Sequence, residues 1–320
     1  MISFIVIGRN EGWKLKKTFE SIFNALSICK IESFEIIYVD SNSTDDSIPN
    51  ALEYGTISVI RLSKYYNPAI ARNVGALNSK GDILIFLDGD MELNPSFLEM
   101  AIIDNKLVKP LVGGVVVDRI IKKDGTLINE VEYHKKEFAY YKLITGGAFL
   151  IERELWELTG GMDNRFVKSA DPELGLRLAK KGFLLYCIPH TFVFHNNDKY
   201  SSDNRLKIRN LFKGYSLFSS VLMFRQNLFS KHTLKKFLLQ EKTFFLLIAT
   251  ILLFVFINNI LVFSVYLIAI ALRAKKIHTP FIFSERLVYF LLRDIISLFA
   301  FILYYPPKIF TKDIPFEKLN

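Results

Sequence analysis

The N-terminal part of the chain alternates between short apolar runs and longer amphipathic stretches. Runs of five or six mostly β-branched or aromatic residues are typical of buried strands, whereas apolar residues that recur every three or four positions are typical of helices. On these patterns we expect strands at 2–7, 34–39, 57–62 and 83–87, and helices at 14–28, 44–53, 68–78 and 95–104. Parallel strands need such crossover helices. The pattern therefore predicts an α/β fold with a mostly parallel, doubly wound, Rossmann-like sheet.

From about residue 111 the alternation becomes less regular. We expect further strands at 112–121, 146–151, 183–188 and 192–195, and helices at 152–159 and 171–181. Gly182 follows the last of these helices, where a glycine commonly ends a helix. We place the end of this first domain at residue 204.

The remaining residues are more apolar and more basic. Residues 205–242 carry nine Lys or Arg against one Glu, with apolar residues at roughly helical spacing. This favours a basic amphipathic helical linker on a lipid surface, and a surface helix packed on the first domain is the alternative. Residues 243–320 are expected to form hydrophobic, membrane-associated helices. The pair Arg293-Asp294 interrupts the last apolar run, which favours an interfacial or a buried, ion-paired helix over a plain span.

Two arrangements are open for the uncharged stretch 243–272. Its length of 30 residues exceeds the roughly 20 that one perpendicular span needs, and Asn258-Asn259 divides it. One tilted helix would place Arg273 and the lysines after it on the non-cytoplasmic side, against the positive-inside tendency. A hairpin of two short helices keeps these charges on the cytoplasmic side, so we favour the hairpin.

Charge divides the chain at the same point as hydrophobicity. Residues 1–204 carry 24 Lys and Arg against 27 Asp and Glu, net −3, whereas residues 205–320 carry 17 against 5, net +12. The first domain is therefore not basic, and nucleic acid is not an expected partner. Basic residues beside apolar stretches are what anionic membrane surfaces attract. We expect a protein at the cell membrane, with its first domain on the cytoplasmic side.

The end of the strand at 83–87 carries the most informative residues of the chain. Asp88 and Asp90 follow it and are separated only by Gly89. Ligands of open α/β sheets bind at the carboxyl ends of the strands. Two carboxylates at this spacing can share a divalent cation that recruits substrate phosphates. On these residues alone, an acidic turn that closes the strand is the alternative.

Four other polar clusters accompany this pair in a fixed order. They are Gly8-Arg9-Asn10-Glu11, the polar run from Asp40 to Ser47, Ala71-Arg72-Asn73-Val74-Gly75, and Ala170-Asp171-Pro172-Glu173-Leu174. Each cluster alone is weak evidence for any one family. The ordered set over about residues 1–197, however, resembles the family 2 glycosyltransferases of membrane-associated bacterial or archaeal type. The resemblance implies a GT-A fold, a nucleotide-diphosphate sugar as donor, and Mn²⁺ or Mg²⁺ as cofactor.

The resemblance also implies roles for particular residues. Asp40 accepts hydrogen bonds from the base or the ribose, and Asp88 and Asp90 hold the metal ion that neutralises the diphosphate. Some relatives use a histidine near His195 as a further metal ligand, and a structural histidine is the alternative. The donor crevice is lined by Ile7, Gly8, Arg9, Glu11, Asp40, Arg72, Asp88, Gly146 and Gly147.

Asp171 matches the aspartate that acts as general base in inverting members of the family. It takes the proton from an acceptor hydroxyl as that oxygen attacks the anomeric carbon from the face opposite the leaving group. The alternative is an aspartate that caps the N-terminus of a helix. Ala170 stands where a glutamate usually precedes the base, so the acceptor side departs from the family pattern.

These features together predict an inverting, metal-dependent transferase of a single sugar. The Gln-x-x-Arg-Trp signature of polymerising relatives is missing after residue 195. The expected donor is UDP- or GDP-linked, and the membrane features favour a lipid-linked glycan acceptor in cell-surface polysaccharide or glycolipid synthesis. An NAD(P)-dependent oxidoreductase is disfavoured because no G-x-G-x-x-G follows the first strand. A nucleotidyltransferase-like enzyme and a degenerate transferase that serves as a membrane scaffold are the alternatives.

Overall fold

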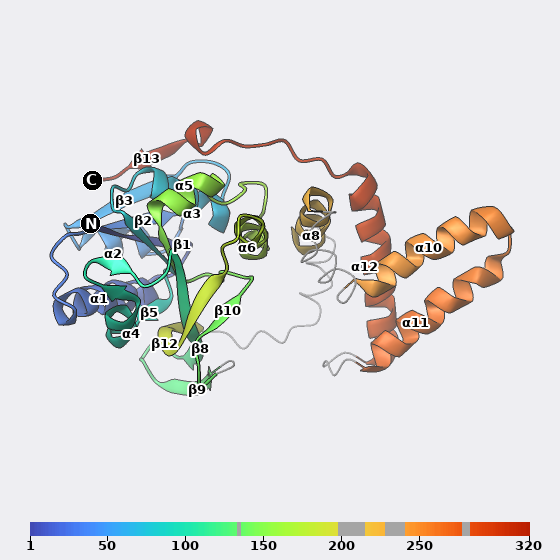
Figure 1. Ribbon diagram of the computed structural model, residues 1–320, viewed down its shortest axis with the longest axis horizontal. Coiled ribbons are helices and arrows are strands. Elements are labelled where there is room, and N and C mark those ends of the chain that lie inside the picture. The colour runs from blue at the N-terminus through green and yellow to red at the C-terminus, as the bar shows by residue number, and fades with distance from the viewer. Residues whose placement is uncertain (133–135, 198–214, 228–240, 277–281) are drawn as a thin grey trace. The chain divides into compact units, whose positions relative to one another are not determined.

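The chain forms two units, each described here by itself. The computed structural model (Figure 1) describes residues 1–132, 136–197, 215–227, 241–276 and 282–320. Unit 1 comprises Met1–Tyr200 and Lys308–Asn320, and unit 2 comprises Ser201–Pro307. Of the linker predicted at 205–242, the structure describes helix α8 (Tyr215–Gln226) and the residues next to it, and the rest lies outside the described residues.

Four parallel strands form the centre of the sheet in unit 1. Their order in the sheet is β4-β1-β2-β3, with bounds β1 (Ile2–Gly8), β2 (Phe34–Asp40), β3 (Ile57–Leu62) and β4 (Ile83–Asp88). The register sets Gly8 beside Asp40 and Ile7 beside Asp88. The carboxyl ends of these strands therefore meet at one edge of the sheet, as the sequence predicted.

The rest of the sheet is mixed, so the sheet is less uniformly parallel than we expected. Strand β11 (Phe149–Glu152) runs antiparallel to β4 and to β8 (Leu111–Ile121), and β12 (Leu185–Asn197) runs parallel to β8. The short strands β5 (Met91–Leu93) and β10 (Tyr140–Lys142) pair with β12, and β9 (Leu127–Glu132) pairs with β8. A separate small hairpin consists of β6 (Ile102–Ile103) and β7 (Lys106–Leu107).

Two runs that the sequence separated are one strand, because β12 continues through both with shifts of register. Strand β9 was not predicted. All six of its residues are exposed, so burial imposes no apolar alternation on its sequence.

Helices cover both faces of the sheet (Figure 1). They are α1 (Trp13–Ile28), α2 (Ser47–Leu52), α3 (Pro68–Leu77), α4 (Pro95–Ala101), α5 (Arg153–Thr159) and α6 (Ala170–Lys180). On one face, Phe19 of α1 contacts Tyr38 edge to face. On the other face, α3 lies so close to β1 that a Cβ atom at Gly75 would come within 2.4 Å of the Ile5 side chain. The doubly wound arrangement is therefore confirmed.

In unit 2, the apolar stretch forms two helices rather than one. Helix α10 (Lys242–Ile257) ends at Asn258, whose φ of 50° is left-handed, and α11 (Phe263–Lys276) follows after the short 3₁₀ helix η1 (Ile260–Val262). Asparagine tolerates this backbone conformation better than most residues. The hairpin alternative, with its turn at the asparagine pair, therefore agrees with the structure.

Helix α12 (Phe283–Leu303) packs on this hairpin through a small apolar core that includes Tyr266 and Phe290. Its polar pair is largely shielded from solvent, with the Arg293 side chain 13% exposed, which agrees with the ion-paired alternative rather than with an interfacial helix. Arg293 forms an ion pair with Glu241. Asp294 is fully buried and accepts a hydrogen bond of 3.3 Å from the Tyr266 hydroxyl.

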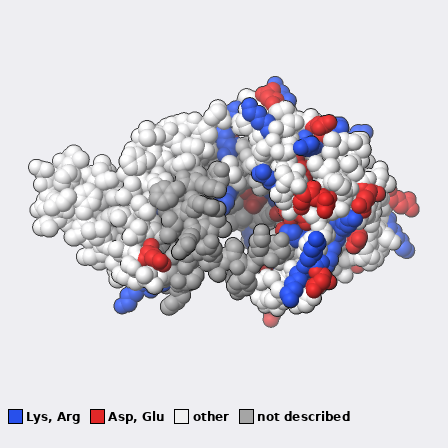
Figure 2. All heavy atoms as spheres, turned by 180° about the vertical axis from the view of Figure 1, so that it is seen from behind, with Lys and Arg blue, Asp and Glu red and all other residues white. Residues whose placement is uncertain are grey.

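The hairpin exposes large apolar side chains around its turn. Phe256 is 85% exposed and Leu261 is 70% exposed. Figure 2 shows few charged side chains on the visible face of this unit. No helix that the structure describes combines the length and the apolar character that crossing a membrane requires.

The C-terminal residues form a strand on unit 1, which differs from our expectation of hydrophobic helices up to residue 320. After the 3₁₀ helix η2 (Thr311–Asp313), strand β13 (Phe316–Lys318) pairs antiparallel with β3. The open edge of β3 offers unpaired backbone groups, and a short segment can satisfy them with few apolar residues of its own. Only Ile314 of this segment is deeply buried, at 3% exposure.

Candidate active site

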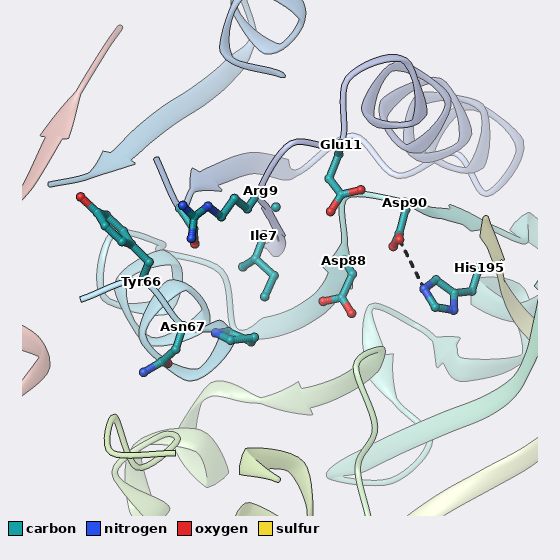
Figure 3. A pocket seen from close by; sticks show the side chains of 11 residues that line it. Ile7, Arg9, Glu11, Tyr66, Asn67, Asp88, Asp90 and His195 are labelled. Atoms are coloured by element: carbon teal, nitrogen blue, oxygen red, sulfur yellow. Dashed lines mark ion pairs between the residues drawn. The ribbon is translucent and has the colours of Figure 1, made fainter. Parts of the chain in front are cut away.

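A cavity of about 340 Å³ opens at the carboxyl ends of β1 and β4. Carboxylates and one imidazole project into it from several elements (Figure 3). Its lining residues are Ile7, Gly8, Arg9, Glu11, Ser41, Tyr66, Asn67, Pro68, Asp88, Asp90 and His195. The cavity therefore lies where ligands of open α/β sheets bind.

Asp90 and His195 lie side by side on one wall of this cavity and point toward each other (Figure 3). His195 Nε2 lies 3.4 Å from Asp90 Oδ2, and His195 Nδ1 lies 2.8 Å from Asp118 Oδ1. Burial opposes protonation of the ring, but the two carboxylates outweigh it and raise the pKa of His195 to about 9. A carboxylate behind a histidine fixes the ring, as in carboxylate–histidine–metal arrangements. Strand pairing sets this geometry, because β12 pairs with both β5 and β8.

Lys14 brings a positive charge to the same carboxylates. Its Nζ atom lies 2.9 Å from Glu11 Oε2 and 3.8 Å from Asp90 Oδ2. Burial and the charge of Asp90 raise the pKa of Glu11, and Lys14 opposes this shift. The lysine comes from the first turn of α1 and is 7% exposed. Sequence reasoning missed it, because a lysine in an amphipathic helix usually faces water.

Arg72 connects Asp88 to the loop before β11. Its Nη2 atom donates to Asp88 Oδ1 at 2.6 Å and to the Gly147 carbonyl at 3.1 Å. Burial raises the pKa of Asp88, the charge of Arg72 lowers it, and the charge of Asp90 raises it. A Cβ atom at Gly147 would lie 2.6 Å from Asp88 Oδ2. Glycine is therefore what lets this loop approach the carboxylate, whereas Gly146 has a left-handed φ of 74°.

Asp171 lies on the other side of the same arginine. Its Oδ1 atom is 3.9 Å from Arg72 Nη1 and, among the described residues, accepts no hydrogen bond. Burial raises the pKa of Asp171 to about 6, the charge of Arg72 lowers it and the charge of Asp88 raises it. The side chain as a whole is 28% exposed, and a partly accessible carboxylate with a raised pKa has the properties that a general base needs.

Asp171 lies on a helix that is closely packed. It occupies the first turn of α6, and the cap residue Ser169 makes no side-chain capping bond. Helix α6 packs so closely on the preceding loop that a Cβ atom at Gly175 would come within 1.7 Å of the Leu143 carbonyl oxygen. The N-cap role that we weighed for Asp171 does not describe its position, because Ser169 is the cap.

Asp40 is fully buried and lies behind the cavity wall rather than on it. Its carboxylate accepts hydrogen bonds from the Tyr38 hydroxyl at 2.9 Å and from the Ser43 backbone N–H at 2.7 Å. These bonds shape the turn after β2, and Ser41 in that turn lines the cavity. The structure therefore places a neighbour of Asp40, and not its own side chain, where a ligand binds.

Tyr66 and Asn67 form a part of the wall that the sequence reasoning missed. The Arg9 guanidinium lies 5.5 Å from the centre of the Tyr66 ring. Asn67 caps α3 by accepting from the Ile70 N–H at 2.8 Å. The pair Asn67-Pro68 before a helical run is a recognisable N-cap pattern. Tyr66 and Asn67 therefore lie at the N-terminus of α3, the helix that carries Arg72.

The structure thus gathers seven of the predicted residues around one cavity. These are Ile7, Gly8, Arg9, Glu11, Asp88, Asp90 and His195. A second group adjoins this cavity, because Arg72 contacts both the Gly147 carbonyl and Asp171. The Asp40 side chain is buried behind the cavity wall. Within the described part of the chain, no three His, Cys, Asp or Glu side chains are arranged to hold a metal ion by themselves.

The chain is similar to several known proteins. The model of the family described as Glycosyl transferase family 2 matches residues 3–162. The O-antigen biosynthesis protein RfbC of Myxococcus xanthus is 25% identical over 61% of the chain. An inactive polypeptide N-acetylgalactosaminyltransferase-like protein 5 of Macaca fascicularis is 28% identical over 62% of the chain.

One solved structure shows the same fold. It is the crystal structure of GalNAc-T7 with UDP, GalNAc and Mn²⁺, with a TM-score of 0.52 and 18% identity over 69% of the chain. The chain spans 17% of RfbC, 52% of the inactive transferase-like protein and 50% of the GalNAc-T7 chain. The relatives therefore contain parts that have no counterpart in these alignments.

Proposed function

The chain belongs to glycosyl transferase family 2, and we propose that it moves one sugar from a UDP- or GDP-linked donor to an acceptor hydroxyl, with inversion at the anomeric carbon. The observation that carries this proposal is the position of Asp171. The carboxylates of Asp171 and Asp88 lie 3.9 and 2.6 Å from the guanidinium of the same residue, Arg72. Because the proposed base Asp171 and the donor-binding Asp88 both lie beside Arg72, the proton would be removed next to the reacting sugar.

The donor occupies the cavity in this proposal. Its base lies toward Arg9, Tyr66 and Ser41, since a ring and a guanidinium offer stacking surfaces. Its diphosphate lies toward Asp88 and Asp90. Asp40 supports the base end through the turn that carries Ser41.

The carboxylates and the imidazole fit a divalent cation, Mn²⁺ or Mg²⁺. Asp90 Oδ2 and His195 Nε2 face each other at 3.4 Å, and Asp118 holds the far side of the ring. Such cations are often held by one or two carboxylates together with substrate phosphates, which agrees with the incomplete protein ligand set. When bound, the cation neutralises charge on the leaving diphosphate.

The residues of the chain carry the remaining steps. Asp171 accepts the proton of the acceptor hydroxyl as its oxygen forms the new bond to the anomeric carbon, and the bond to the diphosphate breaks. Arg72 holds Asp88 and the Gly147 carbonyl in place and balances the charge of Asp171. Asp88, Asp90 and Asp171 are all present, which favours an active transferase over a degenerate one that serves as a scaffold.

Donor binding provides the direct test. In the presence of Mn²⁺, a matching nucleotide sugar at about 100 times its Kd should stabilise the full-length protein by about 2.7 kcal/mol, seen as a rise in Tm. The same sugar should have little effect in excess EDTA. If no UDP- or GDP-sugar raises Tm with Mn²⁺ or Mg²⁺, the proposed activity is wrong.

We further propose that the acceptor is a lipid-linked glycan at the cytoplasmic face of the cell membrane, in cell-surface polysaccharide or glycolipid synthesis. The support is the net charge of +12 in residues 205–320 and the apolar side chains around the hairpin turn. Exposed patches of this kind mark interaction or membrane surfaces.

Salt and substitution separate insertion from electrostatic attraction. The full-length protein should stay on anionic vesicles at about 1 M salt, where the Debye length is only about 3 Å. Replacing Phe256 and Leu261 with aspartate should release it, since a buried aspartate costs roughly 2.5–3.5 kcal/mol in a membrane. Ile128→Asp, at a residue of unit 1 that is 58% exposed, is the matched control. Release of the wild-type protein by salt would rule out insertion of the hairpin.

A further inference from the structure

The C-terminal segment 308–320 belongs to the catalytic unit although the helical unit precedes it in the chain. It pairs with β3 through β13, and its end is fixed by side-chain bonds. Asn320 Oδ1 accepts from the Val59 N–H at 2.7 Å, and Asn320 Nδ2 donates to the Ile57 carbonyl at 2.6 Å. We call residues 308–320 the C-terminal strap.

One buried asparagine joins this strap to the active site. Asn164 is 5% exposed, and its Nδ2 atom donates to the Ile309 carbonyl at 2.9 Å and to Thr311 Oγ1 at 3.1 Å. Both acceptors belong to the strap. The side-chain amide of Asn164 therefore depends on the strap, because a buried amide that loses its hydrogen-bond partners is left desolvated and unsatisfied.

The same asparagine holds helix α3. Its carbonyl oxygen accepts from Asn67 Nδ2 at 3.0 Å, and its Oδ1 atom accepts from Asn73 Nδ2 at 2.7 Å. Asn67 lines the donor cavity. Asn73 is the neighbour of Arg72, so the helix that the strap fixes carries the arginine that contacts Asp88.

The bonds of Asn73 extend this link toward the base. Asn73 Nδ2 donates to the Met162 carbonyl at 2.6 Å, and the Met162 N–H donates to Asn73 Oδ1 at 2.9 Å. Residues 162–169 lead directly into α6, whose first turn contains Asp171. We call Asn67, Asn73 and Asn164 the asparagine cluster. This cluster holds both α3, which carries Arg72, and the loop that leads to Asp171.

We propose that the C-terminal strap is a positioning element of the active site, which acts through Asn164 on α3. An edge strand that only covered β3 would need no bonds to a buried asparagine. Asn164 and Asn320 act through other residues and do not touch the reacting atoms.

Asn320→Ala in the full-length protein tests this proposal. It removes the two side-chain bonds that fix the end of the strap, which lies far along the strap from the asparagine cluster. Loosening the strap should speed amide hydrogen exchange in α3 by at least about fivefold, since exchange reports local opening. The amides of α1 should not change. Thr311→Val, which keeps the side-chain shape but removes the hydroxyl acceptor, should act in the same direction.

Asn94→Ala is the matched control. Asn94 caps α4 by accepting from the Ser96 N–H at 3.2 Å, and loss of such a cap destabilises a helix. This variant is destabilised in the same unit, but in the described part of the chain Asn94 makes no hydrogen bond to Asn67, Asn73 or Asn164. It should leave exchange in α3 unchanged. Equal exchange of α3 in Asn320→Ala and in the wild-type protein would overturn the proposal.

A second measurement uses UDP or GDP with Mn²⁺ and rests on the proposed function. The Kd of the nucleotide should rise by at least about fivefold in Asn320→Ala and stay near wild type in Asn94→Ala. The Leu319 N–H donates to the Val59 carbonyl at 2.9 Å, and the Ser63 N–H donates to the Pro315 carbonyl at 3.1 Å. By reciprocity, the nucleotide should slow exchange of these two amides in the wild-type protein. If neither nucleotide binds the wild-type protein, the proposed function fails, whereas exchange in α3 still decides the role of the strap.

Discussion

Turnover should fall by roughly 10³-fold when Asp171 is replaced with asparagine, because general base catalysis contributes about 10²–10⁴-fold. Asparagine keeps the shape of the side chain but cannot accept the proton of the acceptor hydroxyl. The Kd of the donor should stay near wild type, since Asp171 does not line the donor cavity. Steady-state kcat together with donor titration measures both quantities.

Asp163→Asn is the control for this substitution. Asp163 lies in the loop before α6 and is paired with Arg165 at 2.6 Å, away from the cavity lining. Its loss should change kcat far less than the loss of Asp171. Comparable turnover in Asp171→Asn and wild type would show that another group takes the proton.

The pKa of Asp171, about 6, gives this base a pH dependence with a definite sign. Only the ionised carboxylate can accept a proton, so kcat/KM should fall as the pH drops through about 6 and level off above it. Burial is the main cause of the raised pKa, and the positive charge of Arg72 opposes it. Arg72→Gln should therefore shift this limb of the profile to higher pH, apart from its effect on donor binding.

Metal-dependent donor binding should be lost when Asp90 is replaced with asparagine. Substitutions behind a metal ligand usually cost about 10–100-fold in metal affinity, and loss of a ligand itself should cost at least the upper value. Titration with UDP or GDP in the presence of Mn²⁺ measures the change. Asp118→Asn, which removes the carboxylate behind His195, should give a smaller effect in the same direction.

Asp82→Asn controls for the loss of a negative charge near the strands. Its side chain is 84% exposed and pairs with the N-terminal amine, so it should bind donor as the wild type does. Full turnover of the wild-type protein in excess EDTA would contradict the metal role. Unchanged donor binding in Asp90→Asn would show that Asp90 does not hold the metal ion.

Much of the fold follows from local patterns in the sequence. The four parallel strands and their helices were predicted within a few residues, because buried strands and amphipathic helices each impose their own period on the chain. The turn in the apolar hairpin followed from Asn258-Asn259 for the same local reason. The unpredicted strands β5, β9, β10 and β13 are short or exposed, so burial leaves little pattern in them.

The candidate site was predicted to a similar depth. Residues at the ends of parallel strands converge whatever their distance in sequence, so Asp88, Asp90 and the turn after β1 could be grouped from position alone. The roles of Asp118 and Lys14 could not be predicted in this way. Asp118 reaches His195 only because β8 and β12 are adjacent, and Lys14 reaches Asp90 only because α1 packs beside β5.

The sequence by itself determined the α/β class, the carboxylate pair at the end of β4 and the division of charge between the two parts of the chain. Tertiary structure alone decided that Asp40 is internal and that the C-terminal strap closes the sheet. Val59 and Asn320 are separated by 261 residues. Their contact depends on which strand edge is left open once the sheet has formed, because unpaired backbone groups can be satisfied by any segment that reaches them.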